Sequence, residues 1–164
     1  PKAAGMSLPK ENLAEFKRRL VENCGLTEED LTEKVSIDVI LPFGLVTEQV
    51  ISELKRLEPF GVGNEKPLFA ERNCKLLHAR ILGKNANVLK LTAENEYGKQ
   101  FDVMYFGDIP AFEQDVAETF GKAALDKLFQ GRENSIRMNM IYYPEANEFR
   151  DKVTLQAVMQ YYKF

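Results

Sequence analysis

The order of the periodic segments after residue 66 constrains the fold of this chain more than any other feature. Two-residue alternation of apolar and polar side chains predicts strands at 72–82, 88–93, 100–106, 132–143 and 153–161. Between the third and fourth strands, apolar residues recur at every fourth position from Phe112 to Ala124, which predicts a helix over 109–129, broken at Gly121. Turns are predicted at 83–87, 94–98 and 144–150.

Three strands, a helix and two further strands is the order of an OB-fold, a five-stranded Greek-key barrel. This fold commonly binds oligonucleotides on the face of its second and third strands and in the loop between the first and second, here 83–87. Before residue 67, helices are predicted near 10–24 and over 46–57, with a short strand at 35–41 and a Pro/Gly-rich link at 57–69. The predicted fold class is α+β: a five-stranded OB-fold β-barrel at 67–164, preceded by a small, mostly helical α/β segment at 1–66.

A basic hairpin stands out in an otherwise acidic chain. The 164 residues carry a formal net charge of −3, which excludes a general, whole-surface binder of nucleic acids. Residues 72–93 contain no Asp or Glu, and their cations are Arg72, Lys75, Arg80, Lys84 and Lys90. Binding of a polyanion is therefore expected from a local patch.

Several classes of protein are excluded by composition. There is no run of about 18 apolar residues, so no membrane span is predicted, and the first residues lack the layout of a secretion signal. Cys24 and Cys74 are too few for a disulfide framework, and the single histidine, His78, leaves no His/Cys cluster for zinc. We therefore expect a reducing, cytoplasmic setting. The start at Pro1 is interpreted as a cut from a longer protein.

Four segments together resemble, in order, the C-terminal part of the RecJ family, the bacterial single-strand-DNA-specific exonucleases of the DHH phosphoesterase superfamily. They are AAGMSL (3–8), ENLAEFKRRL (11–20), LEPFGVGNEKPLF (57–69) and NEFRDKVTLQAV (147–158). The resemblance implies that 1–66 are the end of a DHH-associated domain and that 67–164 are the OB-fold domain. It also implies a DHH catalytic domain elsewhere that holds Mn²⁺ or Mg²⁺. The Gly-Gly-His motif of the family is absent, and Asp151 stands where relatives often have Gly.

The residues themselves argue against nuclease activity in this chain alone. Two-metal phosphodiester hydrolysis needs clustered Asp and His ligands that hold ions about 4 Å apart. The chain has one histidine and no Asp-His-His run, and His78 is interpreted as an ordinary strand residue. We expect no catalytic or metal-binding residue here, and a complete small hydrolase is the least favoured hypothesis.

Binding of single strands without base recognition takes a basic groove for phosphates and aromatic faces for bases. The predicted nucleic-acid-binding residues are Arg80, Lys84, Asn85, Lys90, Tyr105, Arg137 and Tyr143. Lys75, Asn87, Phe106 and Tyr142 are further candidates, and one member of each adjacent aromatic pair is expected to face the core. Phe101 and Phe149 are assigned to packing, whereas Asn147 and Arg150 are assigned to the last turn. Phe60, Gly61 and Asn64 are predicted to hold the junction between the two parts.

Two functions of different classes follow. The first is the single-stranded-DNA-binding region of a RecJ-like 5′→3′ exonuclease acting in DNA repair and recombination. The alternative is a protein-interaction module that docks DNA repair proteins or the missing DHH catalytic domain. Salt-sensitive binding to oligonucleotides separates the two.

Overall fold

A computed structural model describes residues 5–31, 34–149 and 152–164. Contacts divide the chain into two compact units, Pro1–Val35 and Ser36–Phe164. The first unit contains a 3₁₀ turn, η1 (Lys10–Asn12), the helix α1 (Leu13–Glu22) and the short helix α2 (Glu28–Leu31). The helix predicted after Pro9 is thus confirmed, although none of the residues of α1 is buried.

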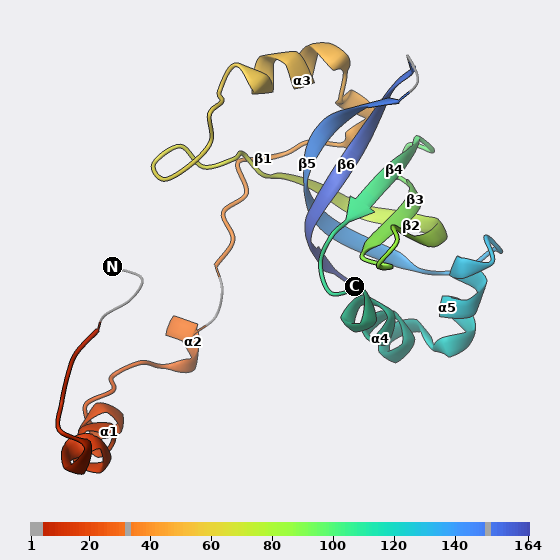
Figure 1. Cartoon of the computed structure of the whole chain (residues 1–164). Helices are drawn as coiled ribbons and strands as arrows, with labels where there is room; N and C mark the ends of the chain where they lie inside the picture. The colour runs from red at the N-terminus through yellow and green to blue at the C-terminus, as the bar shows by residue number, and fades with distance from the viewer. Residues whose placement is uncertain (1–4, 32–33, 150–151) are drawn as a thin grey trace. The chain divides into compact units, whose positions relative to one another are not determined.

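The second unit is a barrel with helices at its ends (Figure 1). Its elements are β1 (Val39–Ile40), η2 (Phe43–Leu45), α3 (Glu48–Lys55), β2 (Phe69–Leu82), β3 (Val88–Glu94), β4 (Gln100–Tyr105), α4 (Ile109–Phe120), α5 (Lys122–Phe129), β5 (Arg137–Phe149) and β6 (Lys152–Lys163). The barrel strands follow the order β2-β3-β4-β6-β5, and pairing of β5 with β2 closes the ring. Only β4 and β6 run parallel within this ring. The prediction of an α+β fold with a five-stranded OB barrel is confirmed.

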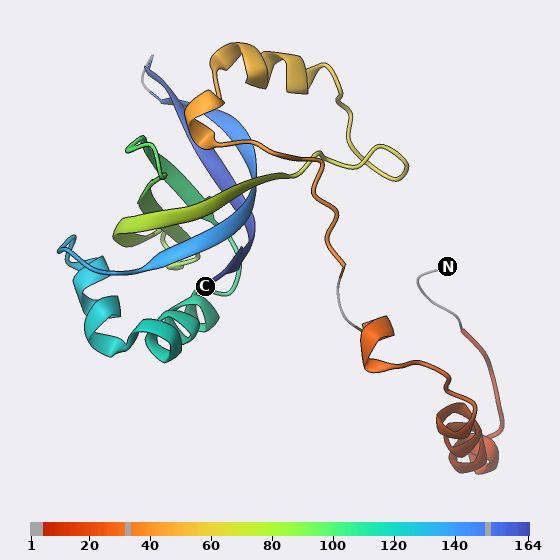
Figure 2. The ribbon, with the colours of Figure 1, turned by 180° about the vertical axis from the view of Figure 1, so that it is seen from behind.

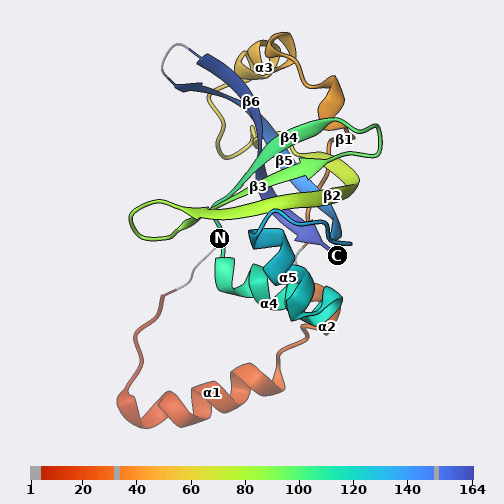
Figure 3. The ribbon, with the colours of Figure 1, turned by 90° about the vertical axis from the view of Figure 1, so that its right-hand side faces the viewer.

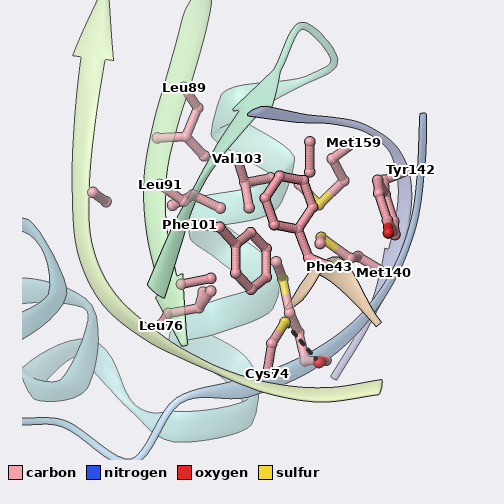
Figure 4. Close-up of a cluster of buried hydrophobic side chains, with 14 of the residues drawn as sticks. Phe43, Cys74, Leu76, Leu89, Leu91, Phe101, Val103, Met140, Tyr142 and Met159 are labelled. Carbon is pink, nitrogen blue, oxygen red and sulfur yellow. Dashed lines mark hydrogen bonds between the residues drawn. The ribbon is translucent and has the colours of Figure 1, made fainter. Parts of the chain in front are cut away.

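The interior of the barrel follows from strand alternation. On β3, alternate residues Leu89, Leu91 and Ala93 are fully buried, and on β5 the alternate residues Ile136, Met138, Met140 and Tyr142 are buried in the same way. Figure 4 shows side chains from all five strands meeting Phe43 in one cluster, with the Cys74 thiol donating to the Met138 carbonyl at 3.2 Å. Burial of this apolar surface is the main stabilising contribution to the fold.

Helices and turns close the two ends of the barrel. At one end, α4 begins where the Asp108 side chain accepts a hydrogen bond from Ala111 N at 2.9 Å, and it buries Phe112 and Val116. Gly121, with φ of 87°, separates α4 from α5, as predicted. The chain ends beside α4 (Figure 2), where the Phe164 ring lies 5.7 Å from that of Phe112. At the other end, Phe43 stacks on Phe101 at 4.5 Å, which confirms the assignment of Phe101 to packing.

Three details of the predicted elements were wrong. The strand at 35–41 is reduced to Val39–Ile40, which pairs parallel to β2. In β2, an irregularity between Leu76 and His78 buries Leu76 and leaves Leu77 only partly buried, so the alternation expected for this strand is interrupted at Leu77 and resumes with Ala79 inside and Arg80 outside. The predicted turn at 144–150 is strand as far as Phe149. Pro144 is tolerated there because β2 pairs with β5 only up to Tyr142, which leaves that edge of β5 free.

The contact-based division of the chain differs from the predicted boundary at 66/67. The compact unit begins at Ser36, because β1 pairs with β2 and because the α3 region supplies buried residues such as Phe43 and Ile51. The assignment of 1–66 to a DHH-associated domain stays a prediction. Asp151 and Arg150 lie outside the described residues, and so does the side chain of Phe149.

Candidate nucleic-acid interface

The outer face of the barrel over β2, β3, β4 and β6 carries side chains in cross-strand rows. One row runs Arg80, Lys90, Met104 and Val158, set by the pairs Arg80↔Lys90, Lys90↔Met104 and Met104↔Val158. We call it the basic row. Arg80, Lys90 and Met104 point away from the interior because their chain neighbours Ala79, Leu89, Leu91 and Val103 are buried, whereas Val158 at the end of the row is itself buried. Two predicted phosphate-binding residues, Arg80 and Lys90, are thereby brought side by side.

An apolar row borders the basic row on the side of the 83–87 loop. Leu82 pairs with Val88, and Phe106 follows directly after β4 on the same side by alternation. Phe106 is 59% exposed, and Leu82 is also exposed. Phe106 stands two positions beyond Met104, the partner of Lys90, so an exposed aromatic residue and the cations of the basic row share this part of the sheet. A single-stranded nucleic acid requires such a combination of a stacking platform and phosphate contacts.

The loop 83–87 supplies a further cation at the end of the β2–β3 hairpin, which extends away from the barrel (Figure 3). Gly83 and Ala86 have φ of 88° and 51°, so the backbone turns tightly within five residues. The positive φ of Gly83 is a backbone conformation that L side chains rarely adopt, which favours glycine at that position. Lys84 and Asn85 are exposed in this loop.

An acid that sequence reasoning missed lies on the same face. Asp102 of β4 pairs with Thr92, and its carboxylate lies 2.7 Å from the Lys90 ammonium. Residues 72–93 therefore contain no acid, but the fold places the Asp102 carboxylate beside them. The turn at 95–99 sets the pairing of β3 with β4, and this pairing places Asp102 diagonally across from Lys90. A hairpin predicted with that turn would therefore have shown Asp102 near Lys90.

The aromatic candidates differ in accessibility. Tyr105 points inward and packs against Phe112 and Tyr162, and burial raises the pKa of its phenol above the ordinary value. Tyr142 is fully buried and donates to the Leu41 carbonyl at 2.7 Å. The expectation that one member of each pair faces the core holds for Tyr105 and Phe106. In the other pair Tyr142 faces the core, but Tyr143 is buried as well, because Phe60 and Lys66 cover it from outside the barrel.

Tyr143 is covered by the segment that precedes the barrel. It is 4% exposed, the Lys66 ammonium lies 3.9 Å from its ring centroid, and Phe60 approaches it edge-on at 6.1 Å. Lys66 also pairs with Glu145 at 3.2 Å. In this arrangement the Tyr143 ring offers no open face to a base.

Arg137 lies away from the basic row. It pairs with Lys75 across β2 and β5, is exposed, and donates to the Asn73 carbonyl at 3.0 Å. Lys75 in turn pairs with Glu94. The structure thus brings Arg137 next to Lys75, at the other end of the β2–β3 pairing from Arg80.

The predicted junction residues build a closed turn. Gly61 and Asn64 exchange backbone hydrogen bonds of 2.8 and 3.1 Å, and the Asn64 amide donates to the carbonyls of Leu57 and Pro59. Through Phe60 this turn contacts the barrel at Tyr143. Its role as a domain junction stays a prediction.

A groove of about 500 Å³ lies elsewhere on the barrel, between β1, β2, β5 and β6. Exposed Ile37, Val39 and Ile40 line one side, and Ile141 lies across from them. Its charged rim includes Arg72.

The family resemblance assigns the divalent metals to a catalytic domain outside this chain. Among the described residues, no group of three or more His, Cys, Asp or Glu side chains is placed to hold an ion. His78 lies against Gly131: a Cβ atom placed on Gly131 would be 3.4 Å from the imidazole ring. Within the same described ranges, no helix is long and apolar enough to cross a membrane.

Comparison with known proteins decides the family. The model of the RecJ OB domain matches residues 37–161, which include β1 to β5 and all but the last two residues of β6. The chain belongs to the RecJ OB domain family. It is also 35% identical over 108 residues to the single-stranded-DNA-specific exonuclease RecJ of Bacillus subtilis (strain 168), a match that covers 65% of this chain.

Solved structures of RecJ share the fold. RecJ from Thermus thermophilus in complex with Mg²⁺ superposes with a TM-score of 0.63 at 18% identity, over 96% of this chain and 21% of that one. The complex with Mn²⁺ gives 0.60 at 17% identity, over 96% and 20%. The match to the Bacillus protein covers 14% of its length. The chain therefore spans a small part of the RecJ proteins that it resembles.

Proposed function

We propose that this RecJ OB domain binds single-stranded DNA on the outer face of β2, β3 and β4, as part of a RecJ-like 5′→3′ exonuclease of DNA repair and recombination. The observation that carries the proposal is the basic row beside the apolar row. Arg80 and Lys90 are paired across β2 and β3, exposed Phe106 follows β4 two positions beyond the partner of Lys90, and Lys84 lies in the loop that joins β2 and β3. The Bacillus subtilis relative is named as specific for single-stranded DNA, which agrees with such a surface.

Each part of the face has a distinct role. Arg80, Lys84 and Lys90 neutralise phosphates, Asn85 donates to phosphate or sugar oxygens, and the Phe106 ring stacks on a base. We leave Tyr105 and Tyr143 out of the contact surface because their rings pack inside the protein, and Arg137 is at most a distal phosphate contact. Stacking and phosphate contacts do not distinguish bases, so binding is expected to be independent of sequence.

The cleavage chemistry belongs, on this proposal, to Mn²⁺ or Mg²⁺ held by a DHH catalytic domain. The OB domain would contribute by holding the strand.

Fluorescence anisotropy with labelled single-stranded and duplex oligonucleotides across a salt series tests the proposal. We expect preference for the single strand and a steep loss of affinity with salt. Arg80→Glu and Lys84→Glu weaken binding, whereas Lys55→Glu, an exposed charge reversal on α3, is the matched control and leaves it unchanged. Equal loss in all three variants, or equal affinity for duplex, would contradict a site on this face.

The protein-docking alternative is favoured by one observation, the groove between β1 and β6. Its exposed isoleucines and valine are apolar side chains that a partner could cover. On this alternative the partners are DNA repair proteins or the DHH catalytic domain of the parent. Ile40→Asp would then abolish partner binding in a pull-down with the recombinant catalytic domain while oligonucleotide affinity is retained.

A further inference from the structure

The Lys90–Asp102 ion pair lies in the middle of the proposed DNA-binding face. The two charged groups are 2.7 Å apart, and their side chains are 31% and 37% exposed, so the pair is open to solvent on its outer side. Lys90 stands directly across from Arg80. Two like charges in opposed positions repel each other, and Asp102 offsets this repulsion in the free protein.

Arg80 and Lys84 differ from Lys90 in this respect. Within the described parts of the chain, neither of them forms an ion pair, whereas Lys90 does. A phosphate that approaches the basic row and the adjoining loop therefore meets two cations without an ion-pair partner in the described ranges, Arg80 and Lys84, and one cation, Lys90, that a carboxylate already neutralises. The same carboxylate repels the phosphate at short range.

Resting on the proposed function, we infer that Asp102 competes with DNA phosphate for Lys90 and thereby limits the affinity of the face. Binding of a strand exchanges the Lys90–carboxylate contact for a Lys90–phosphate contact and leaves Asp102 beside the backbone. Asp102 thus acts on the affinity for DNA through Lys90. A surface weakened in this way holds a strand loosely, which suits a strand that has to move past the protein.

Asp102→Asn tests the inference because it removes the charge and keeps the shape of the side chain. We expect the variant to bind single-stranded dT oligonucleotides about three- to tenfold more tightly at low salt, since one more phosphate is neutralised. The plot of log affinity against log salt should steepen by about 0.7, the value for one phosphate contact on a single strand.

Glu94→Gln is the matched control. It changes net charge by the same amount on the neighbouring strand, and Glu94 accepts a hydrogen bond from Gln100 rather than pairing with Lys90. A second control is Asp102→Asn in the Lys90→Gln background. There the increase in affinity for the oligonucleotide should be no larger than the increase that Glu94→Gln causes. Circular dichroism confirms that each variant of the full chain is folded at the assay temperature.

The outcomes separate this inference from the proposed function. If Asp102→Asn and Glu94→Gln raise the affinity equally, or if Asp102→Asn still raises it when Lys90 is absent, Asp102 does not compete for Lys90. The effect is then one of net charge alone. If Arg80→Glu weakens binding while Asp102→Asn changes nothing, the DNA-binding face stands and the inference fails. If the full chain binds no oligonucleotide even at low salt, both fail.

Discussion

Replacement of Phe106 by alanine should remove the main stacking platform of the face. The ring is 59% exposed, so folding buries less than half of it, and its loss should lower the free energy of unfolding by about 1 kcal/mol or less. A base–aromatic stack is worth about 1–3 kcal/mol, which corresponds to a roughly 5- to 150-fold rise in Kd for a single strand. The salt dependence should be unchanged because no phosphate contact is lost.

Tyr97 provides the matched control for this prediction. It is 74% exposed in the turn between β3 and β4, at the other end of these strands from Phe106. Anisotropy titrations of Phe106→Ala and Tyr97→Ala with the same dT oligonucleotide measure the two effects side by side. Wild-type affinity in Phe106→Ala, or a larger loss in Tyr97→Ala, would refute the assignment of stacking to this end of the sheet.

Two further predictions concern buried groups. Burial, aided by the charge of Glu96, raises the pKa of Glu71, although a hydrogen bond from Phe43 N opposes the shift. The folded state therefore binds the Glu71 proton more tightly than the unfolded state does. This contribution to the free energy of unfolding is fully present below the ordinary carboxyl pKa, and it is lost as the pH rises through the raised pKa of Glu71. Denaturation of Glu71→Gln between about pH 4 and pH 7 should show a flatter decline in unfolding free energy than wild type, and parallel curves would disprove this. Burial also raises the pKa of the Cys74 thiol to about 12, so a disulfide reagent at about pH 8 should label Cys24 alone in the native chain, and rapid labelling of both thiols would contradict the buried position.

Sequence periodicity predicted the barrel well because each strand has one buried face. The alternation around Leu89 and Leu91 and the fourfold spacing from Phe112 are direct consequences of packing, and the structure confirms them. Periodicity failed in β2 at Leu77, where one inserted residue exchanges the inward and outward faces of the strand. It also failed to predict the burial of Tyr143, which the segment before the barrel covers.

The candidate site was predictable only in part for a related reason. Cations clustered in sequence identify a basic hairpin, but charge in space also depends on the strand that pairs with it. Asp102 reaches Lys90 through the β3–β4 register, and Tyr143 is covered by Lys66, 77 positions earlier in the chain. Neither contact follows from local composition, because both arise from pairing and packing between separate segments.

The most direct test of the account is a map of the DNA-binding surface. Amide chemical-shift changes in the ¹⁵N-labelled chain on addition of a dT oligonucleotide can be followed residue by residue in a protein of 18.7 kDa. The account predicts that the largest changes fall in 80–90 and 104–106, on the basic and apolar rows. Changes confined to the groove residues 37–40 and 139–141, or none at saturating oligonucleotide, would contradict it.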